Sequence, residues 1–133
     1  MDIDCIPIGF KNKLNNKVMG FVNPVTSAIY FNSNCDAIPG ETSFILAYEL
    51  GMLLLHKKEI IKNNNIAFLQ KFPLNKESLN EMQKEAICFA IDLLIPEDMF
   101  SNIRKKYPQA DTESLSKIFG VTEEMIRFRI KNN

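Results

Sequence analysis

Residues 44–55 are almost wholly apolar, and they form the strongest pattern in the chain. A helix that is apolar on nearly all sides is typical of the buried centre of a domain. Pro39-Gly40 predicts a turn before this helix, and Thr42 or Ser43 is expected to cap it. Glycine costs about 1 kcal/mol in a helix relative to alanine. We therefore expect another element to approach the helix closely at Gly51.

Two short runs, 17–22 and 27–32, are rich in aromatic and β-branched residues and flank the Asn23-Pro24 break. This arrangement predicts a β-hairpin. The following polar connection, 57–76, contains an apolar patch at 66–69 and predicts no definite structure. Apolar residues then recur at helical spacing and predict a second long helix from about 77 to 95. Its core face should carry Met82, Ala86, Phe89, Ala90 and Leu93. Pro96 fits the first position of a third helix.

The C-terminal residues from 111 onward have the pattern of a helix-turn-helix. A helix over 112–119 should end at Gly120, and Thr122 should cap a second helix that reaches about Lys131. Its apolar residues are expected to pack on the rest of the domain; they are Leu115, Ile118, Phe119, Met125, Ile126 and Phe128.

These elements predict an α+β fold in one domain, 1–133. A short antiparallel sheet at the N-terminal side should pack on a mostly helical body. Residues 1–107 form the expected core, and 108–133 form a helical hairpin packed on it.

Composition narrows the class of protein. A chain of 133 residues suits one domain with a modest core. Lys plus Arg equals Asp plus Glu, so the net charge of zero favours neither nucleic acid nor a membrane surface. The N-terminus lacks the pattern of a secretory signal, and no apolar run is long enough to span a bilayer. Cys5, Cys35 and Cys88 form no closely spaced pair, which indicates reduced, partly buried thiols in a cytoplasm.

Candidate chemistry lies in AYELGMLLLH, residues 47–56. A His-Glu-x-x-His zinc peptidase places two histidines four residues apart on one helix face, and the intervening glutamate activates the water on the metal. Here Glu49 stands at the position of the base. Tyr48 and Met52 stand where the two histidines would be.

The surrounding segments resemble the ImmA/IrrE family of zinc metallopeptidases. They are FILAYELGMLLLH (44–56), QKEAICFA (83–90), LLIPE (93–97) and the tail over 115–129, so that the resemblance spans about 19–131. It implies a small zincin-like domain, with zinc as the cofactor of active relatives. Glu49 matches the catalytic base, Glu85 the third zinc ligand, and His56 a histidine that often follows the motif. Tyr48 and Met52 replace the two histidine ligands.

No metal is expected at the degenerate positions. A tyrosine phenol with a pKa near ~10 is a poor ligand, and a methionine thioether prefers softer ions than zinc. A revised site formed by Met52, His56, Glu85 and Cys88 is a minor alternative. Without a cation, Glu49 and Glu85 would share one cavity, and one of them should have a raised pKa. The Tyr48 hydroxyl is expected to contact a carboxylate or water in place of the metal, with simple core packing of Tyr48 and Met52 as the alternative.

Active relatives cleave helix-turn-helix repressors in the cytoplasm, often those of mobile elements. The resemblance therefore implies a protein partner of this kind, and we expect a catalytically inactive pseudo-peptidase that binds a regulator. Clefts of this class hold extended peptides along a sheet edge. The candidate edge strand is 27–32, which comprises Ser27, Ala28, Ile29, Tyr30, Phe31 and Asn32.

Two other functions stay open. One is an active metallopeptidase with an unconventional metal that cleaves a repressor. The other is DNA binding through the C-terminal helix-turn-helix, where Arg127, Arg129 and Lys131 are basic. However, Glu123 and Glu124 occupy the start of the second helix, where recognition helices usually meet base edges. DNA is therefore the less favoured partner.

Overall fold

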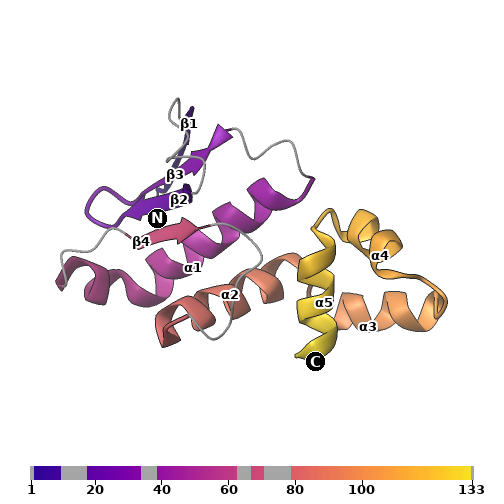
Figure 1. Cartoon of the computed structure of the whole chain (residues 1–133). Helices are drawn as coiled ribbons and strands as arrows, with labels where there is room; N and C mark the ends of the chain where they lie inside the picture. The colour runs from indigo at the N-terminus through magenta and orange to yellow at the C-terminus, as the bar shows by residue number, and fades with distance from the viewer. Residues whose placement is uncertain (1, 10–17, 34–38, 63–66, 71–78, 133) are drawn as a thin grey trace.

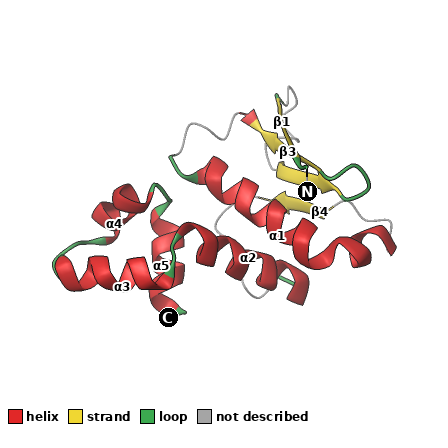
Figure 2. Cartoon of the chain, turned by 180° about the vertical axis from the view of Figure 1, so that it is seen from behind, coloured by secondary structure: helices red, strands yellow, loops and turns green. Residues whose placement is uncertain are grey.

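The computed structural model describes residues 2–9, 18–33, 39–62, 67–70 and 79–132, and it has the predicted α+β architecture (Figure 1). A four-stranded sheet lies on one side of the long helix α1 (Glu41–Lys62), and α2 (Glu81–Leu94) lies on the other. Seen from behind, the remaining helices gather at the C-terminal end of α2 (Figure 2). The central helix is thus covered on two sides, as its apolar sequence requires.

The sheet contains two strands that the sequence pattern did not predict. The hairpin strands are β2 (Val18–Asn23) and β3 (Ala28–Asn32), and the outer strands are β1 (Asp4–Ile8) and β4 (Ala67–Gln70). Their order is β1-β3-β2-β4. The β2–β3 and β2–β4 pairs are antiparallel, as expected, but β1 pairs parallel to β3. The expectation of a purely antiparallel sheet was therefore wrong, because an N-terminal strand joins the far side of the hairpin.

The outer edge of β1 is interrupted by proline. The Asp4 N–H donates to the Ser27 carbonyl, so the backbone groups of Asp4 face β3. Because backbone groups alternate in direction along a strand, those of Cys5 and Pro7 point away from the sheet. Proline has no N–H to offer on that outer side. A proline placed this way is one of the devices that protect an edge strand from pairing with another chain.

Helix α1 begins earlier and ends later than the apolar pattern indicated. It starts at Glu41, so Thr42 and Ser43 lie inside it, and it continues to Lys62. The predicted end at residue 55 coincides with a break in the helical backbone at His56, where φ is −130° and ψ is 18°. The apolar pattern therefore located a kink rather than a terminus.

Helices α1 and α2 pack closely because Gly51 has no side chain. A Cβ atom at Gly51 would lie 2.9 Å from Cδ1 of Phe89 and 3.3 Å from Cα of Ala86. This confirms the close approach expected at Gly51. Ala86 and Ala90 of the predicted core face are buried, together with Ile87 and Ile91. Leu93 is 51% exposed, so its assignment to the core was wrong.

The C-terminal helices follow the predicted boundaries. Helix α3 (Glu97–Lys106) comes directly after Pro96, which precedes the first helical residue rather than occupying it. Helix α4 (Thr112–Phe119) ends at Gly120, whose φ of 67° is favourable for glycine. The Thr122 hydroxyl caps α5 (Glu123–Lys131) by accepting from the Met125 N–H at 3.3 Å.

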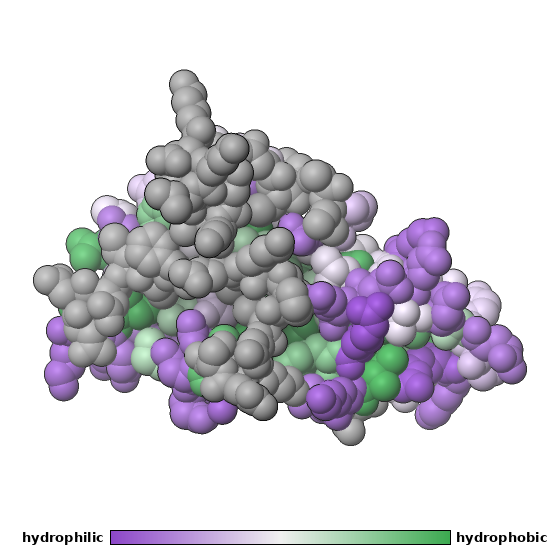
Figure 3. Space-filling model, in the orientation of Figure 1, coloured by the Kyte–Doolittle hydropathy of each residue, from purple (hydrophilic) through white to green (hydrophobic). Residues whose placement is uncertain are grey.

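The C-terminal helices are fixed to the core at two places. The Arg129 guanidinium of α5 is buried, donates from Nε and Nη2 to the Ile95 carbonyl at the end of α2, and lies 2.9 Å from Asp92 Oδ1. A Cβ atom at Gly40 would lie 2.6 Å from the Val121 carbonyl carbon, so the α4–α5 turn abuts the start of α1. On the face seen in Figure 3, hydrophilic residues cover most of these helices, at the right.

Burial of the tail residues agrees with the sequence except at one position. Leu115, Met125 and Ile126 are buried, and Phe119 and Phe128 are partly buried against the core. Ile118 is 50% exposed and was wrongly assigned to the packed face. Of the thiols, Cys5 and Cys88 are exposed rather than partly buried, and Cys35 lies outside the described residues. In the described ranges, no helix is long and apolar enough to cross a membrane.

Candidate functional site

The residues at the motif positions of α1 point into the protein core. Tyr48 is 1% exposed, Glu49 0% and Met52 3%. The Tyr48 ring packs on Phe44 with a centroid distance of 6.0 Å. Helix α1 therefore presents these side chains to the layers that cover it and not to an open cleft. This burial governs the chemistry of all three residues.

Glu49 is a buried carboxyl group beneath the sheet. Strand β2 crosses over it at Gly20, where an added Cβ atom would lie 3.7 Å from Cγ of Glu49. No described residue donates a hydrogen bond to either carboxyl oxygen. Burial raises the pKa of the Glu49 carboxyl well above its ordinary value, since the charged form loses its hydration. The protonated form, which is not a general base, is thereby favoured.

The side chain of Gln83 in α2 faces the Tyr48 hydroxyl. Burial and the neighbouring Glu49 raise the pKa of the Tyr48 hydroxyl, and the Gln83 contact only partly opposes this. Gln83 is itself held by a capping box, in which the Asn80 N–H donates to its Oε1 at 3.0 Å. A carboxylate or water was expected at this place, with core packing of Tyr48 as the alternative. Gln83 had no predicted role, although the Asn80-x-x-Gln83 spacing is a recognisable capping signal.

His56 and Glu85 are brought together from α1 and α2. His56 Nε2 lies 3.2 Å from Glu85 Oε2, in a geometry that does not satisfy a hydrogen bond. His56 is 8% exposed, whereas 59% of the Glu85 side chain is exposed. Glu85 therefore lies at the surface and does not share a buried cavity with Glu49. The two carboxyl groups have different environments.

Cys88 does not join His56 and Glu85. It lines a small cavity of about 140 Å³ with Ile87 and Phe128, between α2 and α5. Across the described ranges, no group of three or more His, Cys, Asp or Glu side chains is arranged to hold a metal ion. The alternative site of Met52, His56, Glu85 and Cys88 would therefore have to be assembled by a rearrangement.

The residues at these positions do not fit a catalytic zinc ion. Such an ion needs three nitrogen, oxygen or sulfur ligands and an open position for water. The Tyr48 oxygen is held in its protonated form, and the Met52 thioether is a soft ligand packed in the core. Only His56 and Glu85 offer ordinary zinc donors, and these two groups face each other. We therefore derive no metal-dependent step for this chain.

The segment 27–32 is not a sheet edge. Strand β3 lies between β1 and β2 and is hydrogen-bonded on both sides, so the assignment of this segment as the edge was wrong. The hairpin pattern identified β3 but gave no sign that the N-terminal strand would cover it. In the described sheet the outer strands are β1, whose edge contains Pro7, and β4, which contacts α1 as well as β2.

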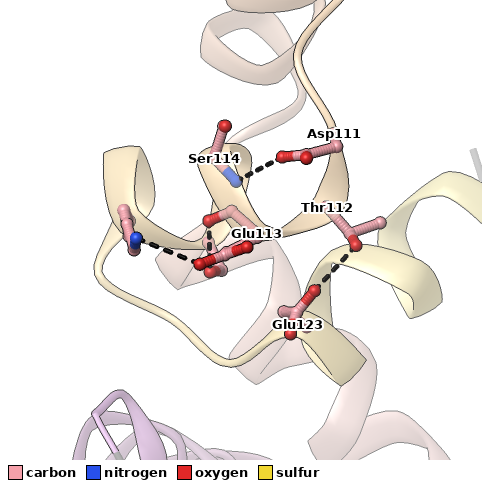
Figure 4. A network of polar contacts seen from close by, with 7 residues as sticks. Asp111, Thr112, Glu113, Ser114 and Glu123 are labelled. Carbon is pink, nitrogen blue, oxygen red and sulfur yellow. Dashed lines mark hydrogen bonds and ion pairs between the residues drawn. The ribbon is translucent and has the colours of Figure 1, made fainter.

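Two of the three basic residues noted in the helix-turn-helix are engaged within the protein, whereas Lys131 is exposed. Arg129 is bound to Ile95 and Asp92, and Arg127 Nη2 lies 3.8 Å from Glu123 Oε1. The Thr112 hydroxyl also donates to Glu123 at 2.8 Å, across the α4–α5 turn (Figure 4). The first turn of α5 therefore carries carboxylates where a DNA-reading helix would meet bases. This arrangement weakens the case for DNA binding.

Comparison with known proteins gives one match. The family described as the IrrE N-terminal-like domain, a peptidase family, matches residues 8–131. A search of curated proteins and a search of solved structures each found no significant match. The matched range includes all of α1 and α2 and the three C-terminal helices.

Proposed function

This chain belongs to the IrrE N-terminal-like domain family of peptidases, and we propose that it acts as a pseudo-peptidase, which binds a cytoplasmic regulator without cleaving it. The observation that carries the proposal is the burial of Tyr48 and Met52 at the two positions of the motif histidines. These side chains occupy the core where a catalytic metal would need ligands and water. In this proposal the protein keeps the fold of the family but not its metal-dependent cleavage.

The state of Glu49 supports the same proposal. A base that activates water must be ionised and within reach of that water. Glu49 is fully buried, and its raised pKa favours the neutral carboxyl. Its position under Gly20 of β2 also makes it a packing residue of the sheet–helix interface.

The proposed partner is a helix-turn-helix repressor or a similar regulator, bound through an extended segment. An added strand uses main-chain hydrogen bonds at a free sheet edge and does not need a metal. Pro7 removes the outward N–H of β1, which leaves β4 as the favoured edge. Strand β4 also contacts α1, so a bound segment would lie beside the former catalytic helix.

The experiment uses the full chain immobilised and exposed to cytosolic extract from its own source cells. We expect capture of a regulator whose intact mass is unchanged, retained through a wash with a metal chelator. Hydrogen exchange of the complex should show new protection in the peptide that contains 67–70. Recovery of cleavage fragments, or loss of the partner on chelation, would establish a working metallopeptidase instead. Protection at β1 and not at β4 would contradict the choice of edge.

A further inference from the structure

The C-terminal helices carry an apolar groove that no part of the proposed function uses. It has a volume of about 460 Å³ and lies between the end of α3 and the outer face of α4. Tyr107, Pro108, Ala110 and Ile118 supply its apolar lining, and Lys106 stands at its rim. We call this feature the tail groove. Its volume is in the range of sites that bind a ligand or a large side chain.

Two large apolar side chains of the tail groove are open to solvent. Tyr107 is 49% exposed and Ile118 is 50% exposed, although the other apolar residues of α4 face the core. An exposed apolar patch with a polar rim is typical of an interaction surface. Nothing in the packing of α4 requires isoleucine at this outward position.

The end of α3, of which Lys106 lines the groove, carries positive charge that is not neutralised. Arg104, Lys105 and Lys106 are consecutive and exposed, and no described carboxylate lies within ion-pair distance of them. Arg104 and Lys106 instead lie over the rings of Phe100 and Tyr107, at 5.5 and 5.4 Å from the centroids. Cations at the C-terminus of a helix interact favourably with the helix dipole. That effect accounts for the charge of α3 but not for the exposed apolar groove beside it.

Nearby carboxylates are already engaged elsewhere. Asp111 caps α4 by accepting from the Ser114 N–H at 2.8 Å, and Glu113 accepts from Lys117 Nζ at 3.1 Å (Figure 4). Glu123 is bound by Thr112. In α4 and α5, Lys117, Arg127 and Arg129 each have a carboxylate partner close by. Lys131 is also exposed and has no ion pair with a described carboxylate, but the three consecutive cations at the end of α3 form the denser positive charge, beside the groove.

We propose that the tail groove binds an acidic polypeptide segment, which inserts one large apolar side chain between Tyr107 and Ile118 and sets carboxylates against Arg104, Lys105 and Lys106. The apolar lining requires an apolar anchor, and the rim requires negative charge. A nucleic acid would supply negative charge but no aliphatic anchor for the apolar lining. This surface is formed by the end of α3, by α4 and by the connection between them, so it is independent of the edge of β4.

Selection from a displayed library of random 12-residue peptides tests the proposal on the full chain. We expect enrichment of sequences with one Leu, Ile, Phe or Trp flanked by several Asp or Glu residues. A fluorescent copy of an enriched peptide should bind with an affinity that falls as salt is raised. Replacement of its apolar residue by serine, or of its carboxylates by amides, should each weaken binding about tenfold or more.

Matched variants locate the site. Ile118→Ser, and separately Tyr107→Ser, should weaken peptide binding about tenfold. Arg104, Lys105 and Lys106 replaced together by Gln should abolish the salt dependence. The controls are Ile130→Ser, at another exposed isoleucine, and the joint replacement of Lys58, Lys62 and Lys131 by Gln. Both controls should bind the peptide like the native chain, and circular dichroism should show that all variants fold.

Three results would overturn the proposal. The first is a selection that enriches no acidic peptides. The second is peptide binding that is equally affected by the control variants. The third is tight binding of a 20-base-pair DNA duplex that is lost on replacing Arg104, Lys105 and Lys106, with no peptide competition, because the rim would then serve nucleic acid.

Discussion

At the scale of single residues, the proposed function depends on Tyr48 and Met52, which stand where the family resemblance places two histidines. Tyr48 and Met52 are not tolerated surface changes, since both side chains fill the core. In our proposal, neither side chain is a zinc ligand, and their burial leaves no space for a metal-bound water. Glu49, the residue that looks most like a remnant of catalysis, is left without a hydrogen-bond donor among the described residues. We expect the buried Glu49 carboxyl group to lower the stability of the folded protein.

Replacement of Glu49 by Gln tests that expectation through its pH dependence. Because its pKa is raised in the folded state, the folded protein retains this proton while the unfolded chain releases it near pH 4.5. Its contribution to stability is complete below that pH and is lost as the pH rises towards the folded-state pKa. Each pH unit in this range costs about 1.4 kcal/mol.

Glu49→Gln has no such proton to lose, so its melting temperature should rise relative to that of the native chain between pH 5 and pH 8. Thermal unfolding followed by circular dichroism measures the difference. Glu59→Gln, at an exposed position of the same helix, is the control and should show little change. A Glu49→Gln difference that stays constant across this pH range would show that Glu49 is already ionised in the folded protein.

At the scale of elements, sequence patterns located helices better than strands. The α4 and α5 boundaries were predicted from Gly120 and Thr122 because capping is a local interaction. Strands β1 and β4 were missed because their pairing depends on residues far away in the chain. For the same reason, the central position of β3 could not be predicted from the hairpin pattern.

Gly51→Ala should destabilise the protein, although alanine is the better helix former by about 1 kcal/mol. The added methyl group would lie 2.9 Å from the Phe89 ring, and such overpacking costs about 1–3 kcal/mol. Urea denaturation should show a net loss of about 1 kcal/mol. In a Phe89→Ala background the same substitution should become neutral or stabilising. Equal losses in both backgrounds would mean that Phe89 is not the obstacle.

Arg129→Met should loosen the contact between α5 and α2. The substitution keeps much of the side-chain volume but removes the donors to the Ile95 carbonyl and the pairing with Asp92. Loss of a charged hydrogen bond to a buried group costs about 2 kcal/mol, which urea denaturation should detect. Arg127→Met removes only an exposed contact of 3.8 Å and should cost less than about 1 kcal/mol. Equal costs for the two variants would contradict the role of Arg129.

At the scale of the whole molecule, the candidate site was only partly predictable. The motif comparison located the central part of α1 and singled out Tyr48 and Met52 from the sequence alone, because the ligands of a His-Glu-x-x-His site lie at fixed helical spacing. It could not predict that Gln83 would meet Tyr48 or that Glu85 would lie at the surface, since both depend on how α2 is turned. The exposure of Ile118 beside unpaired cations was likewise a property of the folded tail.

The molecule as a whole belongs to a peptidase family, and we propose that it differs from active members in its donor atoms. The sheet, α1 and α2 are retained around a closed core, and the tail is fixed to them by Arg129. Such a scaffold offers surfaces at β4 and at the tail groove. Our central claim is that this protein binds a partner and does not carry out metal-dependent cleavage.

Zinc content measured by elemental analysis tests this claim most directly. Native protein and a Tyr48→His/Met52→His variant are each equilibrated with excess zinc and freed of loosely bound metal. We predict that the native chain retains less than about a tenth of a zinc ion per molecule. The double variant has the two imidazoles of the motif and, with Glu85 as the third ligand that the family resemblance implies, should retain about one zinc ion. One zinc ion per native molecule, held against dialysis, would contradict the account.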